Sequence, residues 1–212
     1  MLDLQHMRRE YMKSELDIST VDKNPFVQFE RWFSQALNSE ISEPNSMILA
    51  TSGSDNIPNI RAVLLKIFDE RGFVFFTNYN SQKAKEISEN PNVALEFLWL
   101  DLERQVRIIG ICEKISQSES ISYFAKRSRG SQLGAWISEQ SKIINSRQML
   151  LMQIEKMKEK FKNGKIPLPD FWGGYRVIPQ KIEFWQGRED RIHDRILYEK
   201  KDNTWELKRL AP

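Results

Sequence analysis

Residues 182–195 read Ile182-Glu183-Phe184-Trp185-Gln186-Gly187-Arg188-Glu189-Asp190-Arg191-Ile192-His193-Asp194-Arg195. The stretch begins as a strand, because apolar residues alternate along it, and Gly187 with the charged triplet after it is typical of a turn. A second strand is predicted over 195–198. In an extended chain, a spacing of two puts Arg191, His193 and Arg195 on one face. Two guanidinium groups beside an imidazole suit a phosphate or carboxylate, although the Arg-x-His-x-Arg pattern alone is more often a solvated strand edge.

Composition and charge exclude several classes of protein. The chain has 212 residues and a net charge of +3, with basic residues mixed among acidic ones, so no polyanion-binding surface and no nucleic-acid partner is expected. A single cysteine, Cys112, excludes a disulfide framework and a multi-cysteine zinc site. With only two histidines, no metal site is expected.

The chain is expected to be cytoplasmic and to form one main domain. No apolar run approaches the ~20 residues that span a bilayer, and the N-terminus lacks the apolar segment of a signal peptide. Residues 1–23 are charged and weakly patterned, which predicts a mobile arm. Residues 24–212 are then a single domain.

The hydrophobic periodicity predicts a strand-rich fold with added helices. Asn24-Pro25 is typical of a helix start, and aromatic residues follow at helical spacing. Further helices are predicted after Ser81 as N-cap, over 119–126, and over about 146–162. Strands are predicted over 47–51, 60–68, 72–77, 93–100, 105–115, 175–178, 181–185, 195–198 and 205–209. The linkers are mostly too short for helical crossovers, so an antiparallel β-barrel of the α+β class is favoured.

Three further clusters carry polar residues in settings that suit an anion. Arg61 and Lys66 lie in an otherwise apolar strand, where their odd spacing predicts opposite faces unless a bulge intervenes. Phe76-Thr77 leads to Ser81-Gln82-Lys83 at a helix start, a common phosphate site. Arginine, serine and glutamine crowd the segment 123–141, which could also be a structural linker. No Gly-x-Gly-x-x-Gly or Walker loop is present.

The stretch 182–195 closely resembles the C-terminal motif of the pyridoxamine/pyridoxine 5′-phosphate oxidases, and the other clusters follow in that family's order from about Arg8 to Pro212. The resemblance implies an FMN-binding split β-barrel that works as a homodimer, with two FMN sites at the subunit interface. Carried over by position, the FMN-binding residues would be Arg61, Ala62, Val63, Leu64, Leu65, Lys66, Phe76, Thr77, Gln82, Lys83, Gln105, Gln140, Ser141, Trp185 and Arg195. The substrate-binding residues would be Arg8, Tyr11, Lys66, Tyr123, Arg127, Ser131, Arg191 and His193.

The resemblance also implies the reaction. The family oxidises pyridoxine and pyridoxamine 5′-phosphates to pyridoxal 5′-phosphate with dioxygen as acceptor, which gives hydrogen peroxide, and ammonia from the amine. Arg191 and His193 would orient the reacting end of the substrate and assist proton removal as the catalytic pair. Gln82 departs from the family, which usually has arginine there, and the lost charge is expected to cost about 1 kcal/mol of FMN affinity.

Other functions remain open on the same barrel. A flavin reductase or a phenazine-pathway oxidase would share the FMN clusters but would not need Tyr123, Arg127, Ser131, Arg191 and His193 together. A flavin- or haem-binding storage or sensor protein would bind its ligand without turnover. A nucleic-acid-binding barrel is disfavoured, because the basic residues lie in specific motifs and form no surface stripe.

Overall fold

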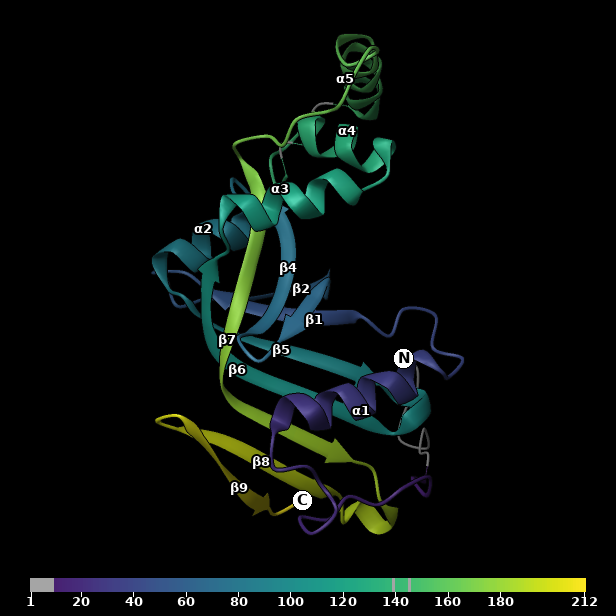
Figure 1. The fold of residues 1–212 in the computed structure, drawn as a ribbon, viewed down its shortest axis with the longest axis vertical. Helices are drawn as coiled ribbons and strands as arrows, with labels where there is room; N and C mark the ends of the chain where they lie inside the picture. The colour runs from purple at the N-terminus through teal and green to yellow at the C-terminus, as the bar shows by residue number, and fades with distance from the viewer. Residues whose placement is uncertain (1–9, 139, 145) are drawn as a thin grey trace, which may run out of the picture. The chain divides into compact units, whose positions relative to one another are not determined.

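The computed structural model describes residues 10–138, 140–144 and 146–212. The chain forms two compact units. Figure 1 labels the helices and strands that they contain. Unit 1 comprises residues 1–49, 94–110 and 179–212, and unit 2 comprises residues 50–93 and 111–178. No helix in the described ranges is long and apolar enough to cross a membrane.

Unit 1 is built on the aromatic helix α1 (Pro25–Leu37). The Asn24 side chain accepts a hydrogen bond from the Phe26 amide, so the predicted cap and the first-turn proline are confirmed. The buried face of α1 presents Phe29 to Phe97, with ring centroids 5.1 Å apart, and Trp32 to Phe184, 5.2 Å apart. Burial of such rings is the main source of stability in a core of this kind.

The C-terminal strands of unit 1 form an antiparallel ribbon. Residues 181–186 at the end of β7 (Trp172–Gln186) pair with β8 (Asp194–Lys201), and β8 pairs with β9 (Thr204–Leu210). Ile196 and Tyr198 of β8 are fully buried, which follows from their alternation with charged residues. A two-residue connection, 202–203, joins β8 to β9, as is common in β-hairpins.

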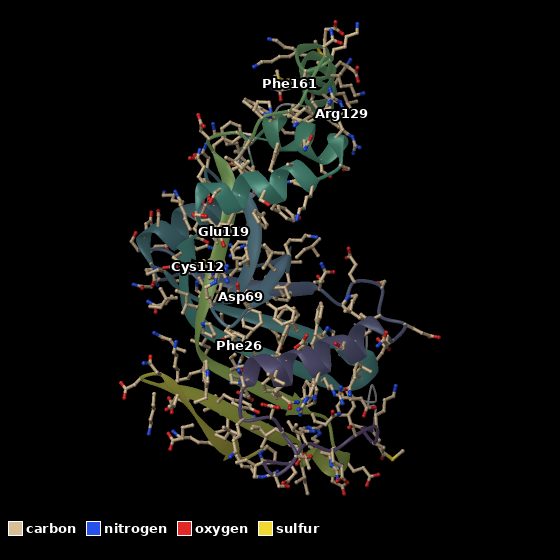
Figure 2. The ribbon with its side chains drawn as sticks, in the orientation of Figure 1. Phe26, Asp69, Cys112, Glu119, Arg129 and Phe161 are labelled. Atoms are coloured by element: carbon tan, nitrogen blue, oxygen red, sulfur yellow. The ribbon has the colours of Figure 1, made fainter. Side chains whose placement is uncertain are left out.

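Unit 2 contains the β4–β7 pair and four helices. β4 (Gly72–Asn78) pairs antiparallel with the start of β7 and with β3 (Ile67–Asp69). The helices are α2 (Gln82–Glu89), α3 (Gln117–Lys126), α4 (Arg129–Ile137) and α5 (Arg147–Lys160). Phe124, Leu133, Ala135, Ile166 and Trp172 make a small buried cluster beneath them. Arg129 of α4 donates hydrogen bonds to the carbonyls of Phe161 and Gly164 after α5. Figure 2 labels Arg129 and Phe161 among the side chains.

The complete strand order is β2-β1-β5-β6-β7-β4-β3, with β8 and β9 continuing from β7. The remaining strands are β1 (Ser46–Ser52), β2 (Pro58–Leu64), β5 (Asn92–Trp99) and β6 (Arg104–Lys114). The predicted strands are thus present and the predicted antiparallel sheet is confirmed. Sequence neighbours pair across short turns, as expected for this class.

Several local predictions were wrong. The strand predicted over 60–68 breaks after Leu64 into β2 and β3, and the strands predicted over 175–178 and 181–185 are one strand, β7. Residues 129–137, which lie between two predicted helices, form a further helix that was not predicted. The Ser81 side chain occupies the N-cap position of α2 but makes no capping hydrogen bond. Residues 189–191 form a 3₁₀ turn with positive φ at Asp190 and Arg191.

Gly72 lies in the turn between β3 and β4 at φ +135°, and a Cβ there would overlap the Val177 carbonyl oxygen. We expect Gly72→Ala to lower the free energy of unfolding by about 3 kcal/mol, because both the backbone and its neighbour would have to move. Urea titration followed by circular dichroism measures the change.

Gly130→Ala is the matched control, because a Cβ at this α4 position meets nothing within 4 Å. It should leave stability unchanged or raise it by up to about 1 kcal/mol. Equal unfolding midpoints for the two variants would contradict the assigned turn.

Candidate functional site

Unit 2 contains a pocket of about 740 Å³. It combines cationic, aromatic, small and hydroxyl side chains from β2, β4, α2, α3 and α4. Its lining residues are Arg61, Ala62, Val63, Leu64, Lys66, Phe76, Thr77, Asn78, Lys83, Tyr123, Arg127, Ser128, Ser131, Gly134, Ala135, Ser138, Gln140 and Trp172. Four of these described lining residues are cations and none is a carboxylate, so the pocket is suited to an anion.

Arg61 and Lys66 both line this pocket, contrary to the opposite faces predicted for one regular strand. The reason is the break between β2 and β3, which ends the two-residue alternation after Leu64. The Lys66 amide donates to the Val74 carbonyl at 2.9 Å, which fixes the chain beyond the break.

Lys83 is a buried cation at one end of the pocket, with 7% of its surface exposed. Its Nζ lies 3.3 Å from Thr77 Oγ1 and 3.4 Å from Gln140 Oε1, both neutral acceptors. Burial, and then the nearby charge of Arg61, hold the pKa of Lys83 below its usual range. An anion in the pocket would offset both effects.

Glu86 lies behind the pocket wall and holds Arg61 in place. Its buried carboxylate accepts hydrogen bonds from Thr51 at 2.5 Å, Asn59 at 2.7 Å and Gln82 at 2.9 Å, and pairs with Arg61 at 3.1 Å. Burial opposes ionisation, yet these donors together hold the pKa of Glu86 below its usual range. The carboxylate therefore stays charged at neutral pH and orients the arginine.

Aromatic rings form another wall. Phe76 stacks on Tyr123 with centroids 3.8 Å apart and on Trp172 at 5.4 Å. The Arg127 guanidinium lies 4.5 Å from the Trp172 ring centroid and donates to the Ser131 carbonyl at 3.0 Å. Burial lowers the pKa of Arg127 and raises that of Tyr123, so the phenol stays protonated. This wall presents fixed hydrogen-bond donors beside a flat apolar surface.

Three predicted residues of unit 2 do not line the pocket. Leu65 is in the core, and the side-chain amide of Gln82 donates a hydrogen bond to Glu86. Ser141 has φ +73°, and its hydroxyl accepts a hydrogen bond from the backbone amide of Gln82 at 3.2 Å. Gln82 and Ser141 therefore lie at the start of α2 without reaching the pocket itself.

Unit 1 brings together Tyr11, Trp185 and His193. The Tyr11 ring lies 5.9 Å from both the Trp185 ring and the His193 ring, and Trp185 and His193 are 4.6 Å apart. The Arg188 amide donates to His193 Nδ1 at 3.1 Å. The neutral imidazole then carries its hydrogen on Nε2, where it is a donor.

The described residues of the predicted N-terminal arm make hydrogen bonds and an ion pair close to the Tyr11–Trp185–His193 cluster. The Lys13 amide donates to the Glu103 carboxylate at 3.0 Å, and the Leu16 amide donates to Asp194 at 3.1 Å. Arg188 pairs with Glu15 and donates to the Ser14 carbonyl. The sequence indicated Tyr11 only through the resemblance. Arg8 lies outside the described residues.

Arg191, His193 and Arg195 do not share one face of a strand, so that prediction was wrong. Arg191 is exposed in the 3₁₀ turn, whereas Arg195 donates to Glu183 at 2.8 Å and to the Ala211 carbonyl at 2.9 Å. Gln105 is half-buried in β6. Arg195 is therefore held by a carboxylate of its own unit.

The sequence missed Trp172 and Glu86 as contributors, whereas Asn78 and Ser138 fall within the predicted clusters but were assigned no role. Glu86 had a signal, because it lies one turn after Lys83 on α2 and is a carboxylate on the face that also buries Ala84 and Ile87. Trp172 had none, since it follows an irregular connector. No group of three or more histidine, cysteine or acidic residues suited to a metal occurs among the described residues.

Two family models match this chain. One, described as pyridoxamine 5′-phosphate oxidase, matches residues 33–161, and the other, described as the pyridoxine 5′-phosphate oxidase C-terminal dimerisation region, matches residues 172–212. A pyridoxine/pyridoxamine 5′-phosphate oxidase of Hydrogenovibrio crunogenus is 60% identical over 211 residues, covering 100% of this chain and 99% of that protein. One from Aliarcobacter butzleri is 56% identical, with 100% of both chains covered.

Solved structures also match. PhzG from Burkholderia lata, in complex with tetrahydrophenazine-1-carboxylic acid, is 27% identical with a TM-score of 0.87, and the match covers 92% of this chain and 95% of that one. A pyridoxamine 5′-phosphate oxidase-related, FMN binding protein from Nostoc punctiforme has a TM-score of 0.71 at 18% identity, covering 87% and 97%. The predicted split-barrel fold is confirmed.

The bond from the Arg188 amide predicts the protonation state of His193. Burial, together with the charge of Arg191, lowers the pKa of this imidazole below 6.5. Below that pKa, protonation puts a hydrogen on Nδ1 and removes the acceptor, so the bond exists only on the alkaline side. We expect ¹⁵N NMR at pH 7 to show a neutral Nε2–H tautomer. His6→Gln leaves one imidazole for assignment, and an Nδ1–H tautomer or a raised pKa would contradict the geometry.

Proposed function

The chain belongs to the pyridoxamine 5′-phosphate oxidase family, and from that membership we propose that it oxidises pyridoxine 5′-phosphate and pyridoxamine 5′-phosphate to pyridoxal 5′-phosphate. FMN is the proposed cofactor and dioxygen the acceptor. The observation that carries the proposal is a pocket whose described lining holds Arg61, Lys66, Lys83 and Arg127 and no carboxylate. Both the cofactor and the substrates bear a phosphate that such a lining would neutralise.

The pocket residues fit FMN in size and charge. A volume of about 740 Å³ lies within the range usual for small-molecule sites. Lys83 is buried beside neutral acceptors, and Arg61 is held by Glu86 at the same end. We assign the FMN phosphate to Arg61 and Lys83, with Thr77 and Gln140 beside them. When bound, FMN supplies a two-electron acceptor that is reoxidised by dioxygen to give hydrogen peroxide.

The substrate phosphate is assigned to Lys66, Tyr123, Arg127 and Ser131. Arg127 and Tyr123 are positioned by the Trp172 and Phe76 rings, and the Ser131 hydroxyl accepts from Ser128 at 2.9 Å. Anchoring the phosphate through several preset donors lets binding energy orient the reacting carbon.

Arg191 and His193 are proposed to act at the pyridine ring. The Nε2–H of a neutral His193 would donate to an acceptor on the substrate, such as the ring hydroxyl oxygen, and Arg191 would orient the reacting end. Gln105, Trp185 and Arg195 are proposed as further FMN contacts and Tyr11, with Arg8, as residues that close over the substrate. Ser141 and Gln82 are proposed to support the FMN site from the start of α2.

The active form is proposed to be a homodimer. Residues 172–212 match a region described as a dimerisation region, which supports this assembly. The proposed FMN sites lie at the subunit interface, as the resemblance implies.

A phenazine-pathway oxidase is the second candidate, because the PhzG structure was solved with a tetrahydrophenazine carboxylic acid. Such a ligand carries one carboxylate and no phosphate. The four cations among the described lining residues, together with the identity of 60% to a pyridoxine/pyridoxamine 5′-phosphate oxidase, favour the phosphate substrates.

Turnover should therefore require the phosphate. With FMN-loaded protein in air, we expect pyridoxine 5′-phosphate to give equal amounts of pyridoxal 5′-phosphate and hydrogen peroxide. Pyridoxine, which lacks the phosphate, should have a kcat/KM lower by about 100-fold or more, because the anchoring bonds to charged groups are lost. Equal rates for both, or turnover of a dihydrophenazine carboxylate alone, would refute the assignment.

Substitutions of Lys83 and Arg191 should have different effects, the first mainly on FMN affinity and the second mainly on turnover. Lys83→Met is expected to raise the FMN dissociation constant about 10- to 100-fold, because a buried charged contact is lost. Arg191→Ala should leave FMN affinity near wild type while lowering turnover about 100-fold. Quenching of FMN fluorescence and oxygen consumption measure the two effects.

Lys85→Met is the control for Lys83, since Lys85 is exposed on the same helix and pairs only with Glu89 at 3.9 Å among the ion pairs of the described chain. It should bind FMN like the wild type. Parallel losses of affinity and turnover in the Arg191 variant would reject the division of roles.

A further inference from the structure

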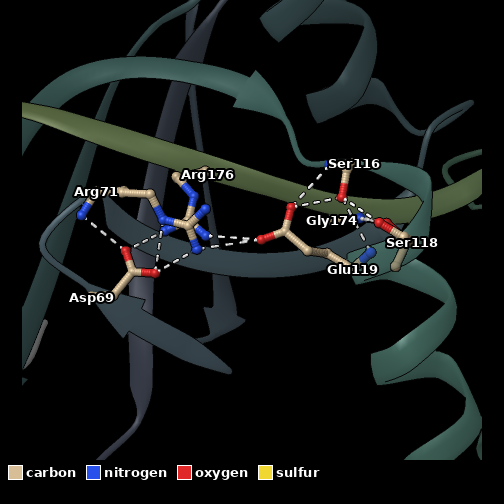
Figure 3. Close-up of polar contacts among 8 residues, drawn as sticks. Asp69, Arg71, Ser116, Ser118, Glu119, Gly174 and Arg176 are labelled. Carbon is tan, nitrogen blue, oxygen red and sulfur yellow. Dashed lines mark hydrogen bonds and ion pairs between the residues drawn. The ribbon is translucent and has the colours of Figure 1, made fainter.

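Arg176 of β7 is buried between two carboxylates outside the proposed site. Its side chain is 5% exposed, with Nη1 2.6 Å from Asp69 Oδ1 and Nη2 3.4 Å from Glu119 Oε1. Arg71, 65% exposed, pairs with the same two carboxylates at 2.7 and 3.4 Å. Figure 3 shows both guanidinium groups lying between Asp69 and Glu119.

The two carboxylates belong to elements that lie next to different lining residues of the pocket. Asp69 ends β3, which begins directly after Lys66. Glu119 lies in the first turn of α3, where it also closes the capping box with Ser116. Tyr123 follows one turn later, and Arg127 is the C-cap of the same helix.

Alternate residues of β7 form a row of contacts along α3. Arg176 pairs with Glu119, the Gly174 amide donates to Ser120 Oγ at 3.3 Å, and Trp172 packs on Phe124 and under Arg127. A spacing of two keeps these β7 residues on one face of the strand. The helix is thereby fixed at both ends, by a charge at its start and by an aromatic ring at its end.

We propose that Arg176 is a positioning residue for substrate phosphate binding, because it fixes the distance between Lys66 and the Tyr123–Arg127 end of α3. The inference rests on the proposed function. Removing the buried guanidinium would leave Asp69 and Glu119 joined only through the exposed Arg71, whose ion pairs are screened by water. The β3 and α3 sides of the pocket would then lose their buried anchor, whereas Arg61 and Lys83 keep their own partners, Glu86 and Thr77.

The test compares Arg176→Met with Arg71→Met, which removes the exposed arginine from the same carboxylates. Arg176→Met should raise the KM for pyridoxine 5′-phosphate about 5- to 30-fold, in line with couplings carried by packed networks. Its FMN dissociation constant should stay within about twofold of wild type, and Arg71→Met should change neither value by more than about twofold, as for exposed ion pairs.

Glu119→Gln is the milder variant for use if Arg176→Met does not fold, and it should raise the KM about 2- to 5-fold at unchanged FMN affinity. A lower melting temperature with unchanged KM in either variant would overturn the proposal, because the network would then be structural only. Parallel changes in KM and FMN affinity would overturn it as well. Absence of turnover by the wild type would instead refute the proposed function.

Discussion

The close approach of α3 to β7 at Gly174 is the constraint on which the pocket depends. Gly174 pairs with Phe76 across the β4–β7 ladder, and its amide binds Ser120 of α3 while its carbonyl accepts from the Ile115 amide. A Cβ at this position would overlap Ile115 Cδ1 and lie 2.9 Å from Phe76 Cε1, so both side chains would have to move. Glycine here leaves Phe76 in place to stack on Tyr123 and Trp172, and this stack holds the helix that carries Arg127.

Electrostatics gives the resulting cavity its chemistry. Glu86 pairs with Arg61 from behind, whereas within the described residues Lys83 donates its hydrogen bonds to the neutral oxygens of Thr77 and Gln140. The lowered pKa of Lys83 reflects the cost of holding a buried ammonium near a second cation. A bound phosphate dianion would restore a full set of charge-assisted hydrogen bonds. The site is thus preorganised for anions at the expense of stability in their absence.

Much of the fold was predictable because its signals are local. Alternating apolar residues predicted the strands, and Asn24-Pro25 predicted the start of α1. The break after Leu64 was not predictable, because Leu65 and Lys66 continue an apolar alternation and only the pairing of β3 with β4 ends it. Helix α4 was missed because glycine and serine have low helix propensity, and its packing against α5 and the Phe124 cluster overrides that preference.

The residues that line the pocket were predicted largely through the family resemblance. The residues that hold them in place from behind were not predicted. Arg61, Lys66, Thr77, Lys83, Tyr123, Arg127, Ser131 and Gln140 all line the pocket. Glu86 and Arg176 lie behind it, where a charged residue in a sequence is indistinguishable from a solvated one. The one-face arrangement of 191–195 failed because positive φ at Asp190 and Arg191 interrupts the extended chain.

The proposed role of the pocket is to hold FMN for oxidation of a B6 phosphate. The most direct measurement is the visible spectrum of FMN-loaded protein without oxygen, before and after addition of pyridoxine 5′-phosphate. We expect the substrate to bleach the flavin absorbance, and we expect the absorbance to return when air is admitted. A bound flavin whose spectrum is unchanged by either the alcohol or the amine substrate would contradict it.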